Sequence, residues 1–182
     1  MRSIALVSLV ALCLAAPAMA QIPSVQSPNI SPQAPPAPRA SSLVDYDGFT
    51  NLASQLGPTR AQRMISLEQF NAMAREQDTL VLDARSPAAF QAGHIRGAIN
   101  LPLTDFTADS LAQVIGNNRN RRILIYCNNN FTDNVYPIMM KMVQLALNIQ
   151  TFINLHGYGY TNVYELRDAV TTHDPAVGWI RG

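Results

Sequence analysis

The sequence has few charged residues, few cysteines and few long apolar runs, and each of these shortages excludes some classes of protein. Of its 182 residues, 14% are charged, and the 13 basic and 12 acidic side chains almost balance. The basic residues form no stripe that could track a phosphate backbone, so we expect no nucleic-acid partner. Two cysteines exclude a disulfide framework and a Cys-rich zinc module, and we expect neither a bound metal nor a cofactor.

One apolar run stands out, at the amino terminus. Arg2 supplies a positive charge, Ile4 to Ala16 is mainly apolar, and Ala18 and Ala20 place small side chains where a signal peptidase reads them. We therefore predict a signal peptide over residues 1–20 and an exported protein, periplasmic or secreted. The mature chain would have no membrane span, because no later apolar run approaches the roughly 20 residues that a span requires. It would keep one thiol, at Cys127.

The next segment has the composition of a linker. Six prolines lie between Gln21 and Arg39, with almost nothing large and apolar among them. Such a composition is typical of a disordered or polyproline-like tether, which we assign to residues 21–42. We assign residues 43–182 to one folded domain, which begins with a short helix that Gly57-Pro58 stops.

From Arg60 onward, strand and helix patterns alternate. Apolar strands are predicted over residues 64–65, 79–82, 98–102, 121–126 and 162–166. Helices are predicted over residues 67–74, 86–90, 109–115, 136–147 and 149–155, the first of them opened by a capping box of Ser66 and Gln69. Strands that are apolar throughout and separated by helices indicate an α/β domain, with a central parallel sheet and helices on both faces.

Three methionines, Met139, Met140 and Met142, fall within the predicted helix over residues 136–147. Thioether sulfur is a soft ligand, but no histidine or cysteine lies nearby to complete a metal site. We interpret these methionines as core residues of the helix.

Two segments resemble the signatures of a known family. VLDARS at residues 81–86 with FQAGHIRGAINL at residues 90–101, and GYTNVYEL at residues 159–166, are similar to the sequences of rhodanese-like domains, in the sulfurtransferase superfamily. The resemblance covers Arg60 to the carboxyl terminus. It implies a three-layer α/β domain whose strand over residues 121–126 delivers Cys127 to a loop.

The first signature also has a physical interpretation. Asp83 and Arg85 are expected to form an ion pair that braces the edge of the crevice, close to the site but outside the chemistry. We expect His94 to tie the turn by hydrogen bonding. His156 and His173 are interpreted as isolated surface residues.

The loop after Cys127 departs from the family. In rhodaneses a short loop, usually with glycine and arginine, curls its backbone amides around the sulfur and lowers the thiol pKa. Here the loop has no glycine and no cation. Asparagine tolerates left-handed backbone, so an amide cup remains feasible. We predict a substrate-binding loop made of Asn128, Asn129, Asn130, Phe131, Thr132 and Asn134.

The absence of an arginine from this loop affects which substrates the site could bind. Thiosulfate and phosphate esters are dianions, and Asp133 adds repulsion where the family adds attraction. Phosphoryl transfer depends on such a cation, which argues against a phosphatase.

Two hypotheses remain. In the first, Cys127 is the catalytic nucleophile of a sulfurtransferase and forms a persulfide, with a sulfane-sulfur donor and a thiol acceptor as partners. Asp133 or Thr132 would then donate a proton or position a group, and the substrate would be neutral or cationic. In the second, the domain is a catalytically inactive module that binds a ligand or an unidentified protein partner.

Overall fold

The computed structural model describes residues 43–181. The predicted signal peptide and proline-rich linker lie outside these residues. A main sheet of five parallel strands has the order β1-β6-β5-β2-β4. Its strands are β1 (Met64–Ile65), β2 (Thr79–Asp83), β4 (Ile99–Asn100), β5 (Arg122–Tyr126) and β6 (Val163–Leu166). A separate antiparallel pair joins β3 (His94–Ile95) to β7 (Trp179–Ile180).

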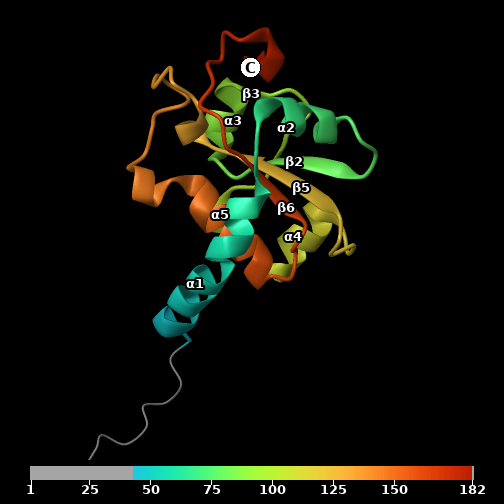
Figure 1. The fold of residues 1–182 in the computed structure, drawn as a ribbon, viewed down its shortest axis with the longest axis vertical. Helices are drawn as coiled ribbons and strands as arrows, with labels where there is room; N and C mark the ends of the chain where they lie inside the picture. Colours follow the sequence, from blue (N-terminus) through green and yellow to red (C-terminus); the bar gives the residue numbers. More distant parts are fainter. Residues whose placement is uncertain (1–42, 182) are drawn as a thin grey trace, which may run out of the picture. The chain divides into compact units, whose positions relative to one another are not determined.

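Helices cover the sheet on both faces, as Figure 1 shows. They are α1 (Tyr46–Arg63), α2 (Leu67–Ala74), α3 (Pro87–Ala92), α4 (Ala108–Ile115) and α5 (Leu147–Gly157). One apolar core, with Leu82, Leu111 and Phe152, lies between the sheet and α4 and α5. The other, with Phe70 and Leu124, lies on the side of α2. This arrangement confirms the predicted fold class, because a sheet buried on both faces needs strands that are apolar throughout.

Local signals in the sequence set several boundaries as expected. The Ser66 hydroxyl accepts from Gln69 N, and the Gln69 side chain accepts from Ser66 N, so the predicted capping box opens α2. Ser86 caps α3, with Pro87 in its first turn. Gly116 ends α4 with φ 95°, which favours glycine.

The first helix is longer than predicted, because Gly57-Pro58 does not stop it. A proline inside a helix costs about 3 kcal/mol or more. Tertiary contacts at the end of α1 oppose that cost. Arg60 binds both carboxylate oxygens of Glu165, at 2.7 and 2.6 Å, and the Arg63 guanidinium lies 4.4 Å from the centre of the Tyr164 ring. The sequence pattern did not reveal these distant partners.

The predicted helix over residues 136–147 is wrong. The chain there is irregular apart from one short 3-10 turn at Val143–Leu145, and α5 begins only at Leu147. Asparagine side chains bind the backbone of residues 139–141 and so compete with helical hydrogen bonds. The interpretation of the three methionines as core residues is wrong for the same reason, since all three side chains are exposed.

Two classes of feature do not occur among the described residues. No helix within residues 43–181 is long and apolar enough to cross a membrane. The same residues hold no group of three or more His, Cys, Asp or Glu side chains that could bind a metal ion.

Candidate active site around Cys127

Cys127 follows the last residue of β5, in the middle of the parallel sheet. Its backbone is extended, and a short 3-10 turn at Asn128–Asn130 comes directly after it. Only 1% of the residue is exposed. It contributes to the wall of a cavity of about 330 Å³ that Asn129, Asn148 and Glu165 also line. The candidate nucleophile therefore lies at the carboxyl end of the sheet, as the resemblance implied, but beneath other residues.

Main-chain amides converge on the sulfur. The Asn130 N–H donates to Cys127 Sγ, and the backbone N–H groups of Asn129, Leu147 and Asn148 favour a negative charge on the same sulfur. Leu147 and Asn148 are the first residues of α5. The positive end of this helix therefore faces the sulfur, an arrangement that stabilises a negative charge there.

Burial nevertheless has a larger effect on the pKa of the Cys127 thiol than the backbone amides have. Removal from water disfavours the thiolate and raises the pKa of Cys127, and the nearby Glu165 carboxylate adds to the increase. The amides of Asn148, Asn129 and Leu147 lower the pKa, but by less. In the described conformation Cys127 is therefore a thiol, and not a thiolate, at neutral pH.

Asn130 is the centre of a buried network. Its Oδ1 accepts from Cys127 N at 2.9 Å and from Asn148 Nδ2 at 3.0 Å. Its Nδ2 donates to Leu166 O at 2.7 Å. Both ends of the Asn130 amide are therefore hydrogen-bonded within the domain, where they join β5, β6 and α5. From the sequence, Asn130 was expected in the substrate-binding loop.

Three other asparagines bind the segment that follows. Asn128 Nδ2 donates to Met139 O, and Asn129 pairs with both Lys141 N and Lys141 O. Asn134 has φ 46° and its Oδ1 accepts from Met140 N. These side chains therefore fix the conformation of the loop. Their amides bind the backbone, whereas we expected them to bind a substrate.

Thr132 and Asp133 are turned toward the carboxyl-terminal segment. Thr132 donates to Val170 O through its N–H and its hydroxyl. The Asp133 carboxylate accepts from Thr171 Oγ1, Thr172 N and the His173 ring. His173 is thus not isolated, contrary to expectation.

Asp133 is also poorly suited to donate a proton. Desolvation opposes ionisation of its carboxyl group, but hydrogen bonds from Thr172 N and Thr171 Oγ1 outweigh it and lower the pKa of Asp133. Its carboxylate is bound to residues 171–173, away from the role of proton donor to Cys127 that the sequence suggested.

Phe131 belongs to the core. Its ring packs edge-on against Tyr126, with centroids 6.1 Å apart, and against Trp179, with centroids 4.9 Å apart. Only 1% of Phe131 is exposed. A substrate therefore has no access to this ring, although the sequence placed it in the binding loop.

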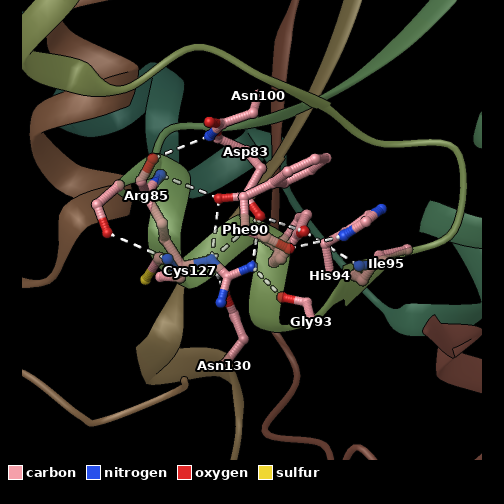
Figure 2. Close-up of polar contacts among 12 residues, drawn as sticks. Asp83, Arg85, Phe90, Gly93, His94, Ile95, Asn100, Cys127 and Asn130 are labelled. Carbon is pink, nitrogen blue, oxygen red and sulfur yellow. Dashed lines mark hydrogen bonds and ion pairs between the residues drawn. The ribbon is translucent and has the colours of Figure 1, made fainter. Parts of the chain in front are cut away.

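The first signature forms a rigid network beside the site, shown in Figure 2. Arg85 Nη2 lies 2.6 Å from Asp83 Oδ2, and both side chains are buried. Tyr126 donates its hydroxyl to the same Asp83 oxygen at 2.5 Å. Burial and the Asp83 charge raise the pKa of Tyr126 well above its usual value, so the hydroxyl keeps its proton. His94 Nδ1 lies 2.8 Å from Phe90 O, so this ring ties the turn.

Sequence reasoning missed several residues of the site. Asn148 is buried, and its Oδ1 has no hydrogen-bond partner among the described residues. Arg60 and Glu165 form their ion pair in the wall of the cavity beside Cys127. A carboxylate inside an apolar strand was the available signal, since a buried charge requires a partner. Asn148 carried no signal of its own.

Comparisons with known proteins agree with the fold. The family model for the rhodanese-like domain matches residues 66–171. A tRNA uridine(34) hydroxylase from Photorhabdus laumondii is 29% identical over 72 residues, which are 38% of this chain. The chain spans only 20% of the length of that relative.

Similar solved structures include two sulfurtransferases. A human single-domain sulfurtransferase is 16% identical, with a TM-score of 0.43, over 59% of this chain and 90% of its own. A polysulfide-sulfur transferase from Wolinella succinogenes is 15% identical, with a TM-score of 0.40, over 66% and 79% of the two chains. Because the family match spans more than half of the sequence, this chain belongs to the rhodanese-like domain family.

Proposed function

We propose that the domain carries sulfane sulfur on Cys127 as a persulfide. The observation that supports this most is the convergence of backbone amides from Asn129, Leu147 and Asn148 on the sulfur. Such donors stabilise the negative charge of a thiolate or of a terminal persulfide sulfur, and they require no arginine.

The transfer balances without an oxidant. Cys127 loses its proton and attacks the outer sulfur of a hydropersulfide donor, R–S–SH. The donor S–S bond breaks, a new S–S bond forms on Cys127, and the leaving thiolate takes up the proton to become R–SH. A second thiol then attacks the outer sulfur and returns Cys127 to its starting state.

The cavity favours a neutral or cationic donor over a dianion. Its two arginines are already paired, Arg60 with Glu165 at 2.6 Å and Arg167 with Asp168 at 3.3 Å, and the loop contributes no cation. Asn148 Oδ1 has no hydrogen-bond partner among the described residues, so it is free to accept a hydrogen bond from a ligand with N–H or O–H groups. Thiosulfate has no such groups to offer, and it would find no unpaired cation in the cavity.

Access to the sulfur requires a local movement. Val143 and Ala146, from the segment before α5, line the cavity beside Cys127. Loops held by a few hydrogen bonds open at far smaller free energies than the whole domain unfolds. We therefore expect slow sulfur uptake, limited by opening of this segment and by the small thiolate fraction.

The test compares two donors on the full chain. Cysteamine hydropersulfide, which is cationic, and thiosulfate are each incubated with the protein, and digested peptides are weighed for one added sulfur atom at Cys127. We expect the cationic donor to react about tenfold faster or more, because the dianion loses its hydration in a cavity whose cations are already paired. Cys127→Ser is the control, and it should gain no sulfur at residue 127. Absence of added sulfur from both donors contradicts the proposal.

A second candidate is a binding module without turnover. It is favoured by the 1% exposure of Cys127 and by the internal hydrogen bonds of the loop asparagines. For this function, the folded chain takes up no sulfur from either donor, whereas the urea-unfolded chain does. The same experiment therefore separates the two candidates.

We also propose that the protein is exported. The proposal rests on the charged start, the apolar run and the small residues of the first 20 positions. Terminal sequencing of the protein from its own cells should find Gln21 first. An intact Met1 on the folded, abundant form contradicts it.

A further inference from the structure

The segment between Cys127 and α5 presents a dense set of apolar side chains to solvent. Between residues 135 and 145, seven large apolar residues are 48% to 76% exposed. They are Val135, Tyr136, Met139, Met140, Met142, Val143 and Leu145. We call this set the apolar segment. Soluble domains rarely expose so many neighbouring apolar side chains unless the surface binds a protein or a membrane.

Part of the backbone of the apolar segment is paired from within the domain. Asn128 and Asn129 bind the carbonyl groups of Met139 and Lys141, while Asn129 and Asn134 accept from the N–H groups of Lys141 and Met140. Ile138 N and Leu145 N donate to carbonyl groups of the same segment. Unpaired backbone groups are the main obstacle to moving a loop into an apolar medium. The asparagines reduce that obstacle.

Charge around the apolar segment is positive. Lys141 is the only charged residue between positions 134 and 146, and it is exposed. The exposed Arg181 shares a cavity with Val135 and Tyr136, and the exposed Arg167, which pairs with Asp168 at 3.3 Å, shares one with Val143. The adjacent carboxylates, Asp133 and Glu165, are turned inward and bound to other groups.

We propose that the apolar segment docks the domain on the surface of an anionic lipid bilayer. Its side chains would enter the boundary between headgroups and acyl chains, with the backbone at headgroup level and Lys141 extended toward the phosphates. The basic side chains that flank it would add attraction to anionic headgroups.

This inference is independent of sulfur chemistry at Cys127. It concerns the outer face of the segment whose inner residues line the cavity beside that cysteine.

Methionine oxidation tests the inference on the full chain, with a readout confined to the segment. The protein is treated briefly with hydrogen peroxide, alone and with vesicles of phosphatidylcholine containing about one-third phosphatidylglycerol, and sulfoxide is measured peptide by peptide. We expect anionic vesicles to slow oxidation of Met139, Met140 and Met142 about threefold or more. Met73, half-buried on α2, is the internal control and should keep its rate. Pure phosphatidylcholine vesicles should protect less.

A variant separates the segment from any other membrane contact of the chain. The triple substitution Met142→Ser, Val143→Ser and Leu145→Ser should lose the protection of Met139 and Met140, while Ile99→Ser, at an exposed apolar position on β4, should retain it. Equal oxidation with and without anionic vesicles overturns the proposal. Protection that grows with protein concentration without lipid, or that appears only with an added protein, also overturns it, because a second copy or another protein then covers the segment.

Discussion

The turns at the ends of two neighbouring strands, β2 and β5, differ in the chemistry of their side chains: one is charged and the other is neutral. After β2, a buried carboxylate and a buried guanidinium pair at 2.6 Å. After β5, neutral asparagines and backbone amides surround a buried thiol. The charged turn is rigid because neither charge can be left unpaired, whereas each bond of the neutral turn can be broken alone at modest cost. We therefore expect the neutral turn to open more readily than the charged one.

The largest effect should come from breaking the charged turn. Asp83→Asn removes the partner of a guanidinium that is 3% exposed, and loss of one member of a buried pair costs several kcal/mol. We expect the free energy of unfolding to fall by about 4 kcal/mol in urea titrations. Glu76→Gln, in the exposed pair with Arg122, is the control and should change stability by less than about 1 kcal/mol. Equal losses in the two variants would show that the Asp83 pair is not special.

A smaller loss should follow from Asn130→Asp. The new side chain keeps its shape but cannot donate to Leu166 O, and it places a carboxylate beside that carbonyl group. We expect unfolding free energy to drop by about 3 kcal/mol. Asn117→Asp, at an exposed position of the loop after α4, serves as the matched control with little change. A neutral outcome for Asn130→Asp would place this residue outside the network described above.

Asn129→Ala should loosen the neutral turn locally. It removes both hydrogen bonds to the Lys141 backbone, for a net cost of about 1 kcal/mol. If Cys127 is reached by opening this segment, its alkylation should accelerate about fivefold, the factor that corresponds to that free energy. Unchanged alkylation, measured on the Cys127 peptide, would mean that the segment does not control access.

The smallest effect concerns Asp133 and depends on pH. Hydrogen bonds from Thr172 and Thr171 outweigh desolvation and lower the pKa of Asp133, so this group stabilises the fold above the usual carboxyl pKa. The contribution disappears as the pH falls through the lowered value. Asp133→Asn should therefore cost less than about 1 kcal/mol at pH 7, and the cost should vanish at pH values below the lowered pKa of Asp133. A difference that grows toward low pH would reverse the assigned direction.

The two turns also differ in how far the sequence revealed them. Asp83 and Arg85 lie two positions apart at the end of an apolar strand, so their pairing and its place were predictable. The role of Asn130 depends on Leu166 and Asn148, which are 36 and 18 positions away. No local pattern announces such partners.

The same limit explains the two misplaced helices. Periodic apolar residues over 136–147 favour a helix, but asparagines from outside that stretch bind its backbone. Pro58 favours a helix end, but Glu165, more than one hundred positions away, holds Arg60 in α1. Strands, side-chain caps and the Gly116 stop of α4 were predictable because their causes are local.

The pH dependence of Cys127 alkylation in the folded chain tests the central claim most directly. Iodoacetamide reacts with thiolates, and peptide-level mass spectrometry distinguishes Cys127 from Cys13. A sulfur buried among amides, as described here, should react slowly at pH 7, with a midpoint above the ordinary thiol value and a rate far below that of the urea-unfolded chain. Fast reaction at neutral pH, with a midpoint below the ordinary value, would contradict the account.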